Sequence, residues 1–560
     1  MTRQAKPLFR TICAFATLLA CSCQSTREKP IPLTAPPEPR IGFSPAQGIP
    51  PLPKPFREFR GLWIASVYNI DWPSAKGLSA AQLAIEADRI LDAARAIGIN
   101  AVFFQTRAAA DALYLGSAEP WSASISGRRG TPPPANFDPL AYFIAGARAR
   151  GILCYAWINP FRAGLSSPAK SETSPIETPD SPGPPSELVK NLDSGLLWLD
   201  PGSSAAREYV VSVAVDIVAR YAPDGLVVDD YMYPYQSMLG GAASIPDDES
   251  YAAYRASGGM LNKASYRVHN ASEFMRLLSR RIEEVSPGMP IGASPFGIRR
   301  SGEPEGIRGA SGIDETGIDL LEWAREGLVD FASPQLYWPT TAVEQSYPIL
   351  LAWWKAALES AAREGGREAP ALWPSIAPFG KKLDESLRAH EAASQALFAR
   401  ALLGEASGVV LYSARPFSED RYGVYSALSG PFGKAALWPP LPARAKEGSD
   451  EARGPRAHIV SAVGAGGESS GSLHLEFIFE ESSRKILLYS LREAKQGLAW
   501  KLELLPARER ESLALDILAP EGRLVGLAVC AADARGRLGA LDLRIGDAFS
   551  RLLSDSARSR

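Results

Sequence analysis

Residues 224–235 have the sequence DGLVVDDYMYPY, in which a short apolar run ends at two aspartates followed by three tyrosines. A run of this length, rich in valine and bounded by polar residues, is typical of a buried strand, here predicted over 225–229. The preceding segment, 203–221, repeats apolar residues every three or four positions and predicts a helix. A helix leading directly into a buried strand indicates an α/β fold with parallel strands.

Seven further segments of the same kind surround this one. The eight predicted strands are 60–67, 100–106, 152–158, 225–229, 290–293, 329–333, 371–376 and 408–412. Helical patterns lie between them, for example over 79–97 with Ser79 as the N-cap. Eight such units favour an α/β fold of the (β/α)8 TIM-like barrel type. An open doubly wound sheet is the alternative, but residues 65–69 lack the Gly-rich phosphate loop of such sheets.

The N-terminal segment is predicted to be an export signal. A basic start is followed by a short apolar run that ends Leu18-Leu19-Ala20-Cys21, which resembles a bacterial lipobox. We predict a lipoprotein signal peptide over 1–21, lipid on Cys21, and a Pro-rich disordered tether over 22–55. The expected location is the cell envelope, lipid-anchored at the outer membrane or cell surface. An ordinary signal peptide with an incidental cysteine is the alternative.

Beyond the predicted barrel, the alternation of strand and helix patterns gives way to short strand-like runs. We place the barrel at 56–436, a linker at 437–453, and a small all-β sandwich at 454–550, where short strand-like runs alternate with turns. A disordered tail is predicted for 551–560. The protein is expected to be a monomer.

Composition excludes several classes of function. With 60 basic and 62 acidic residues the net charge is −2, so no excess of positive charge favours nucleic acid. The four histidines are far apart in sequence, and none has a second histidine or cysteine at metal-ligand spacing. We therefore expect no metal, no cofactor and no nucleic-acid partner.

Active sites of such barrels lie where the strands end, and those positions carry carboxylates, amides and aromatic rings. Such groups suit sugar recognition, and glycosidic cleavage generally uses two carboxyl groups. The predicted catalytic residues are Asp230, Asp229 and Asp111. The predicted substrate-binding residues are Asp71, Trp72, Arg107, Trp157, Asn159, Tyr231, Tyr233, Gln335, Tyr337 and Trp338.

Structural roles remain open for several of these residues. Asp71 and Asp111 could cap loops, Arg107 could pair with an aspartate, and Trp157 lies within a strand and could be core. Because neighbouring strand residues point to opposite faces, one of Asp229 and Asp230 could serve only the backbone.

Several motifs together resemble the glycosyl-hydrolase-like family ten. They include Arg60-Gly61-Leu62-Trp63, Asn69-x-Asp71-Trp72-Pro73-Ser74, Asp111-Ala112-Leu113-Tyr114, Ala156-Trp157-Ile158-Asn159-Pro160, Asp229-Asp230-Tyr231-x-Tyr233-Pro234-Tyr235 and Pro334-Gln335-Leu336-Tyr337-Trp338. The resemblance implies a glycosidase-like barrel, a fibronectin type III-like C-terminal domain, and peptidoglycan glycan as substrate. It also places the main catalytic role on Asp230. Residues 108–110 are three alanines where the family usually has Pro-x-Gly, which bears on substrate fit.

The predicted function is therefore hydrolysis of N-acetylated cell-wall glycan, with peptide-free peptidoglycan strands as the substrate. Two mechanisms remain open. Asp71 or Asp111 could be the second carboxyl group, or the two adjacent aspartates could work with the acetamido group of the substrate. The alternative function is a non-catalytic glycan-binding lipoprotein.

Overall fold

The computed structural model describes residues 49–164, 183–240, 244–379, 384–442, 454–465, 472–494, 497–507, 511–516, 518–519 and 522–545. The predicted signal peptide, Cys21, most of the predicted tether and the C-terminal tail lie outside these residues. No helix in the described ranges is long and apolar enough to cross a membrane.

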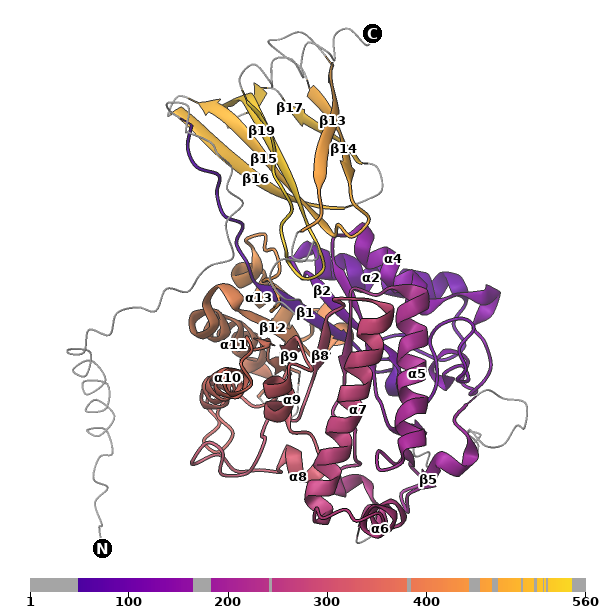
Figure 1. The fold of residues 1–560 in the computed structure, drawn as a ribbon. Helices are drawn as coiled ribbons and strands as arrows, with labels where there is room; N and C mark the ends of the chain where they lie inside the picture. Colours follow the sequence, from indigo (N-terminus) through magenta and orange to yellow (C-terminus); the bar gives the residue numbers. More distant parts are fainter. Residues whose placement is uncertain are drawn as a thin grey trace, which may run out of the picture. The chain divides into compact units, whose positions relative to one another are not determined.

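A parallel sheet forms the centre of the larger domain (Figure 1). Its strands are β1 (Phe59–Ile64), β2 (Ala101–Arg107), β3 (Leu153–Ile158), β7 (Gly225–Val228), β8 (Ile291–Ala293), β9 (Phe331–Ala332), β10 (Ala371–Leu372), β11 (Ser375–Ile376) and β12 (Gly408–Leu411). They lie in the order β10-β9-β8-β7-β3-β2-β1-β12-β11, and all adjacent pairs are parallel. The predicted α/β class with parallel strands is confirmed, the observed sheet is curled, and each of its strands lies within one residue of a predicted segment.

The two ends of this sheet are parts of one short segment. β10 pairs with β9 at one end and β11 pairs with β12 at the other, yet only Trp373 and Pro374 separate β10 from β11. The predicted seventh strand, 371–376, is therefore split between the two edges.

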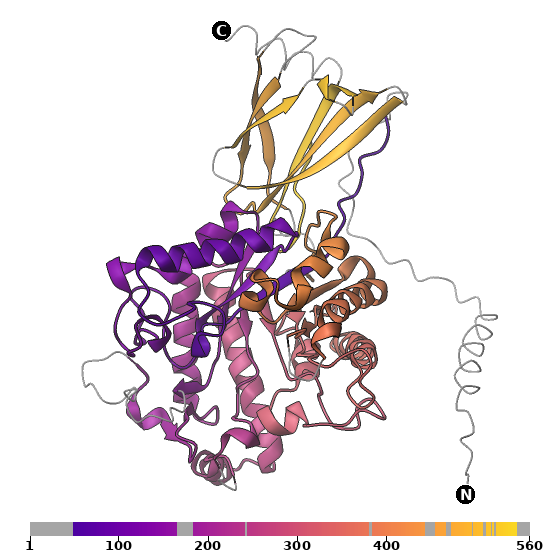
Figure 2. The ribbon, with the colours of Figure 1, turned by 180° about the vertical axis from the view of Figure 1, so that it is seen from behind.

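Helices surround the outside of the sheet (Figure 2). The main ones are α2 (Ala80–Ala96), α4 (Pro139–Ala149), α5 (Ser204–Tyr221), α7 (Lys263–Val285), α9 (Leu320–Glu326), α10 (Tyr347–Glu364), α11 (Arg388–Leu403) and α13 (Val424–Phe432), with α6 (Asp248–Ala256), α8 (Gly312–Thr316) and α12 (Ala414–Ser418) in the connections. α2 begins at Ser79, whose side chain accepts from the main-chain N–H of Gln82 in a capping box, as the N-cap prediction required.

Alternation along the strands fills the interior with aromatic rings. In β1, Leu62 and Ile64 pack toward the helices, whereas Phe59 and Trp63 point inward. Glycine makes room for these rings, since a Cβ on Gly292 would lie 2.0 Å from the ring of Phe331. The inner rings include Phe59, Phe103, Tyr155, Phe331 and Trp373. They close the amino-terminal half of the interior, which leaves space only toward the carboxyl ends of the strands.

The connection after β3 contains a small antiparallel sheet rather than only a loop. β4 (Arg162–Gly164), β6 (Leu197–Leu199) and β5 (Val189–Asn191) pair in that order. Trp198 in the middle strand is buried and donates its indole N–H to the carbonyl of Met232, 3.0 Å away. This sheet fixes the segment that follows Asp229 and Asp230.

The C-terminal region consists of antiparallel strands, β13 (Ala457–Ala465), β14 (Ser472–Phe479), β15 (Lys485–Ala494), β16 (Gly497–Pro506), β17 (Glu511–Asp516), β18 (Leu518–Ala519), β19 (Gly522–Ala532) and β20 (Asp542–Ile545). Its contacts with the larger domain are at the amino ends of the parallel strands: Arg484 bonds Asp224 before β7, and Arg535 bonds Asp330 before β9. Within the predicted linker, Leu437 and Trp438 are buried, and Trp438 donates to the carbonyl of Asp533. The fibronectin type III-like assignment stays a prediction.

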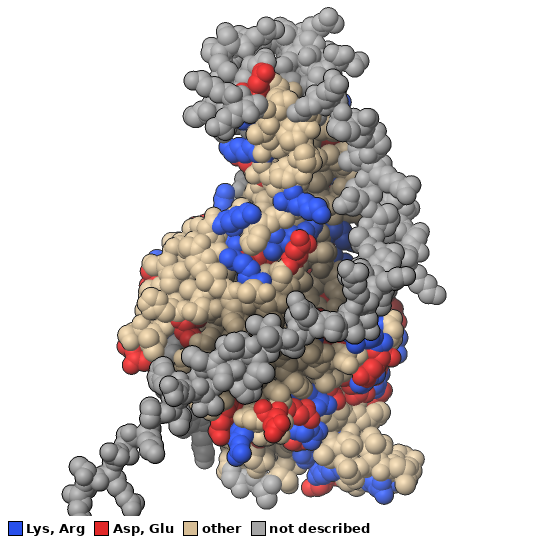
Figure 3. All heavy atoms as spheres, turned by 90° about the vertical axis from the view of Figure 1, so that its left-hand side faces the viewer, with Lys and Arg blue, Asp and Glu red and all other residues tan. Residues whose placement is uncertain are grey.

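Charge is mixed on the surface. The face in Figure 3 carries both basic and acidic side chains, and neither sign covers it alone. This face therefore offers no surface of a single charge for a highly charged partner.

Candidate active site

A cavity of about 470 Å³ opens at the carboxyl ends of the strands, and we call it the first cavity. Its walls come from residues in or just after β1, β2, β3, β7, β8, β9 and β12: Trp63, Gln105, Trp157, Asp229, Asp230, Ser294, Gln335, Tyr337 and Tyr412. Convergence of so many strands on one space is the usual construction of a barrel active site. Trp63 and Trp157, whose ring centroids lie 4.7 Å apart, cover the aromatic interior below.

Asp229 and Asp230 both line this cavity, because β7 ends at Val228. The alternation that would send adjacent side chains to opposite faces holds only inside a strand. The main-chain N–H of Asp230 donates to Oδ1 of Asp229 at 2.9 Å and so fixes the turn after the strand. The structure thus brings the two predicted catalytic residues together.

Each carboxyl group also accepts a hydrogen bond from a neutral aromatic side chain. Oδ2 of Asp229 accepts from the indole N–H of Trp157 at 3.1 Å, and Oδ2 of Asp230 accepts from the hydroxyl of Tyr235. Oδ1 of Asp230 is buried and has no hydrogen-bond partner among the described residues. Within the same residues, neither carboxyl group forms an ion pair with Lys or Arg.

The protonation of the pair follows from its environment. Burial raises the pKa of Asp230 well above its ordinary value, and the charge of Asp229 raises it further. Burial also raises the pKa of Asp229, but the N–H of Asp230 and the charge of Arg162 oppose this. The pKa of Asp230 is therefore raised more strongly than that of Asp229.

Tyr231 and Arg162 form one wall of the first cavity. The guanidinium of Arg162 lies 4.4 Å from the ring centroid of Tyr231 and donates to the carbonyl of Ala108 at 3.0 Å. A cation over an aromatic face is held in place without a carboxylate partner. Its charge therefore acts on the aspartate pair rather than being neutralised locally.

Gln105 is a cavity residue that the sequence-based assignment did not include. Its Oε1 accepts from the main-chain N–H groups of Ser66 and Val67 at 3.0 and 2.9 Å. These donors fix the orientation of the amide and leave its Nε2 as a buried donor without a partner among the described residues. Tyr412 and Arg162 were also not among the assigned site residues. The position of Tyr412 directly after a strand is the signal that could have identified it, whereas Arg162 lies four residues beyond β3.

Gln335 and Tyr337 line the first cavity as predicted positions, and Trp338 lines a neighbouring one. The amide of Gln335 donates to the carbonyl of Ser294 at 3.2 Å and lies 3.5 Å from Oδ1 of Asp229. These residues come from the segment after β9, so this segment supplies part of the cavity wall near the aspartate pair.

Three predicted substrate-binding residues lie in the packed interior instead. Trp72 is fully buried and donates its indole N–H to the carbonyl of Leu83 at 3.0 Å. Tyr233 is fully buried and its hydroxyl accepts from Asn270. Asn159 is fully buried as well. None of the three is in the wall of the first cavity.

Asp71 and Asp111 hold the backbone. Asp71 accepts from the N–H groups of Ala65 and Arg415 and from the hydroxyl of Ser413, at 2.7–2.8 Å. Oδ1 of Asp111 accepts from two consecutive N–H groups, those of residues 108 and 109. Neither side chain lines the first cavity, so the structure does not bring either of them to the aspartate pair.

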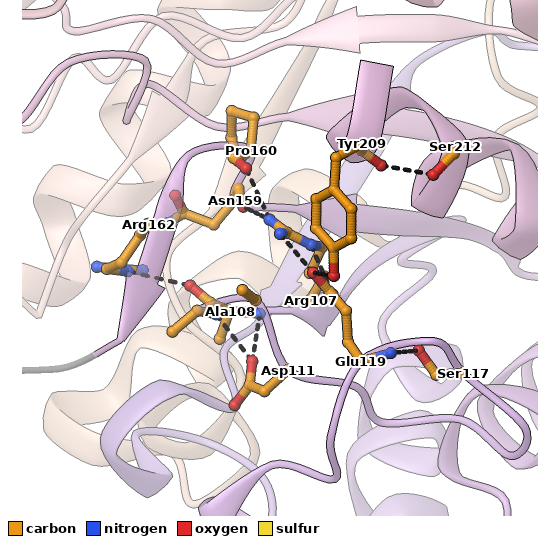
Figure 4. A network of polar contacts seen from close by, with 12 residues as sticks. Arg107, Ala108, Asp111, Ser117, Glu119, Asn159, Pro160, Arg162, Tyr209 and Ser212 are labelled. Carbon is orange, nitrogen blue, oxygen red and sulfur yellow. Dashed lines mark hydrogen bonds and ion pairs between the residues drawn. The ribbon is translucent and has the colours of Figure 1, made fainter. Parts of the chain in front are cut away.

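Arg107 belongs to a closed network beneath the loops (Figure 4). It forms two parallel bonds to Glu119, of 2.7 and 2.6 Å, and donates to the carbonyls of Asn159 and Pro160. Tyr209 adds a third contact to Glu119. Both charged side chains are fully buried, so Arg107 is a structural partner that is inaccessible from the cavity.

The described residues contain no group of three His, Cys, Asp or Glu side chains placed to hold a metal ion. The chemistry of the first cavity is that of carboxyl, amide, phenol and indole groups.

Comparisons with known proteins agree with this chemistry. Residues 58–363 match the family described as Glycosyl hydrolase-like 10. The chain is 32% identical over 356 residues to the glycosyl hydrolase DigH of Escherichia coli K12. This alignment covers 60% of this chain and 76% of DigH. It is also 32% identical over 303 residues to the glycosyl hydrolase YngK of Bacillus subtilis, covering 53% of this chain and 58% of YngK.

Solved structures give only distant likenesses. A chitinase of Rhizomucor miehei aligns with a TM-score of 0.35 at 13% identity, covering 67% of this chain and 99% of the chitinase. An α-galactosidase of Thermus thermophilus aligns with a TM-score of 0.31 at 15% identity, covering 66% of this chain and 62% of that chain. The family match extends over more than half of the sequence and includes the aspartate pair, and the chain therefore belongs to the glycosyl hydrolase-like 10 family.

Proposed function

We propose that this protein is a glycoside hydrolase that cleaves N-acetylated cell-wall glycan, with peptide-free peptidoglycan strands as its substrate. The observation that carries the proposal is the Asp229–Asp230 pair, which places two buried carboxyl groups side by side in the wall of an aromatic-lined cavity. Membership of a glycosyl hydrolase-like family supports it.

Asp230 is the proposed general acid. A carboxyl group of raised pKa keeps its proton near neutral pH and can donate it to the leaving glycosidic oxygen. Tyr235 occupies Oδ2, so the proton belongs on Oδ1, the oxygen without a partner among the described residues. As the bond to the anomeric carbon breaks, that oxygen leaves as a hydroxyl and Asp230 becomes ionised.

Asp229 and the substrate supply the second half of the reaction. Asp229 and Asp230 are the two carboxyl groups in the wall of the first cavity, and adjacent residues cannot flank one bond from both sides. Asp229 can instead accept from the N–H of a 2-acetamido group, whose carbonyl oxygen then attacks the anomeric carbon. Water opens the resulting ring with Asp230 as base. This favours substrate assistance over a separate carboxylate at Asp71 or Asp111.

The remaining walls would select the sugar. Trp63, Trp157 and Tyr337 offer aromatic faces for a pyranose ring, and Nε2 of Gln105 offers a fixed donor to a hydroxyl or carbonyl oxygen. We also propose that the parallel sheet is a closed (β/α)8 barrel, that the C-terminal strands form a fibronectin type III-like domain, and that lipid on Cys21 anchors the protein in the envelope.

Product analysis tests the function. Purified protein would be incubated with peptide-free glycan, peptide-bearing peptidoglycan, and peptide-free glycan stripped of its acetyl groups. We expect soluble oligosaccharides from the first substrate only, with retention of anomeric configuration by NMR of fresh products. Cleavage of the deacetylated glycan would contradict substrate assistance. Binding of the glycan without any product would make the protein a glycan-binding member of the family.

A further inference from the structure

A second cavity, of about 640 Å³, lies beside the first. The two share Ile70, Tyr337 and Tyr412 as a common wall, and the two tyrosine rings stack with centroids 5.7 Å apart. The rest of the second cavity is mainly apolar, with Phe296, Trp338 and Phe379 among its walls. Nothing in the reaction described above uses this space.

An aromatic path joins the second cavity to the reacting groups. Tyr235, which donates to Asp230, lies 6.1 Å from Phe296 between ring centroids, and Phe296 lies 5.6 Å from Trp338. These rings meet edge to face, at interplanar angles of 64° and 86°, whereas the wall that both cavities share is the stacked pair of Tyr337 and Tyr412. A glycan chain that lies over the aspartate pair can extend past this shared wall into the second cavity.

The charged residues in the wall of the second cavity differ in whether their side chains already have hydrogen-bond or ion-pair partners. Glu391 accepts from the N–H and hydroxyl of Thr340 and from the amide of Gln395. Arg421 pairs with Glu419. The main-chain N–H of Arg415 is held by Asp71, but its guanidinium has no hydrogen bond or ion pair among the described residues.

We propose that Arg415 binds a free carboxylate on the sugar that occupies the second cavity. A guanidinium in apolar surroundings gains most from a carboxylate, to which it can make two parallel bonds. In cell-wall glycan the muramic acid residue carries a lactyl carboxylate, which is free when the peptide is absent and becomes a neutral amide when the peptide is attached. Arg415 would then be the residue that favours peptide-free strands. The inference rests on the proposed function, because it assumes a glycan over the aspartate pair.

The test compares two matched oligosaccharides of peptide-free strands, one with free lactyl carboxylates and one with these groups converted to methyl amides. Their binding would be measured by calorimetry on the Asp230→Asn protein, and kcat/KM on the wild type. We expect the free acid to be favoured by about 10- to 100-fold, the ratio that loss of a charge-assisted hydrogen bond predicts. Arg415→Gln should lower the free-acid value to that of the amide and leave the amide value unchanged.

Two further variants make the result specific. Arg415→Lys keeps the charge without the two-pronged geometry and should retain part of the preference. Arg325→Gln, which removes an exposed partner of Glu364, should retain all of it. The inference would be overturned if the protein that retains Arg415 bound both oligosaccharides equally. It would also be overturned if Arg415→Gln weakened the binding of both by the same factor. A clear preference in binding without any cleavage by the wild type would uphold Arg415 and reject the hydrolase.

Discussion

Two buried clusters of ionisable side chains lie at the carboxyl ends of the parallel strands, and they are built in opposite ways. After β2, Arg107 and Glu119 are fully buried and neutralise each other through two parallel bonds. After β7, the acidic residues Asp229 and Asp230 are buried side by side without a cationic partner among the described residues, and they are held by an indole, a phenol and a main-chain N–H.

The difference separates structure from function. Burial lowers the pKa of Arg107, but the charge and hydrogen bonds of Glu119 raise it by more. Arg107 therefore keeps its proton and its partner, and the pair has no group free to react. The unmatched pair keeps a proton that it can donate, at the cost of burying a second carboxyl group. We therefore expect substitutions in the first cluster to affect folding and substitutions in the second to affect catalysis.

Asp230→Asn should give the largest effect. The variant removes the transferable proton with little change of shape, so kcat should fall by about 10³-fold or more. Stability measured by urea unfolding should be unchanged or slightly higher, because a neutral amide replaces a group that is costly to bury. A variant that unfolds readily would instead show that Asp230 is needed for folding, as is expected of Arg107 and Glu119.

Glu119→Gln should act mainly on stability. Removing one partner of a buried ion pair leaves the charge of Arg107 uncompensated, which costs about 3–5 kcal/mol. Chemical unfolding measures this loss, and Glu364→Gln, at an exposed ion pair, serves as the control with a change below ~1 kcal/mol. If Glu119→Gln were as stable as the wild type but inactive, the Arg107 network would belong to the active site.

Asp71 is an intermediate case, since it is buried without a cation but held by several donors. Burial raises its pKa from 3.8 to about 6, against the opposing bonds from Arg415, Ala65 and Ser413. The folded state therefore binds the proton more tightly than the unfolded state, and this contribution is present below pH 4 and lost as the pH rises through about 6.

The corresponding measurement compares wild type with Asp71→Asn across pH 4–7. The stability of the wild type relative to the variant should decline over this range by up to ~3 kcal/mol, at ~1.4 kcal/mol for each unit of pKa shift. A constant difference would mean that Asp71 titrates as it does in the unfolded chain.

Tyr235→Phe should give the smallest effect. The hydroxyl of Tyr235 lowers the pKa of Asp230, so its removal should raise that pKa and move the alkaline limb of the activity profile to higher pH. The loss of kcat at the optimum should stay within about tenfold, the value of one hydrogen bond. Tyr142→Phe, which loses a similar bond to Asp88 at the surface, should leave the profile unchanged.

The sequence predicted the strands and the place of the aspartate pair because buried apolar runs and their abrupt polar ends are local features. It did not predict which way a side chain points after a strand ends. Trp72 and Tyr233 lie in segments that follow strands, as Tyr231 does, yet they turn into the core, because contacts with Leu83 and Asn270 decide their direction. Arg107 was open between two roles for the same reason, since Glu119 lies outside the strand-end pattern.

The split segment 371–376 has a practical consequence for dividing the chain into fragments. The family match ends at residue 363, before β10, β11 and β12. A fragment ending there would expose β1 and β9 as unpaired edges, and such edges promote aggregation. It would also lack Tyr412 and Arg415, so a failure of that fragment to bind or cleave glycan would be uninformative, whereas one that continues at least to residue 442 retains both edge partners and both cavities.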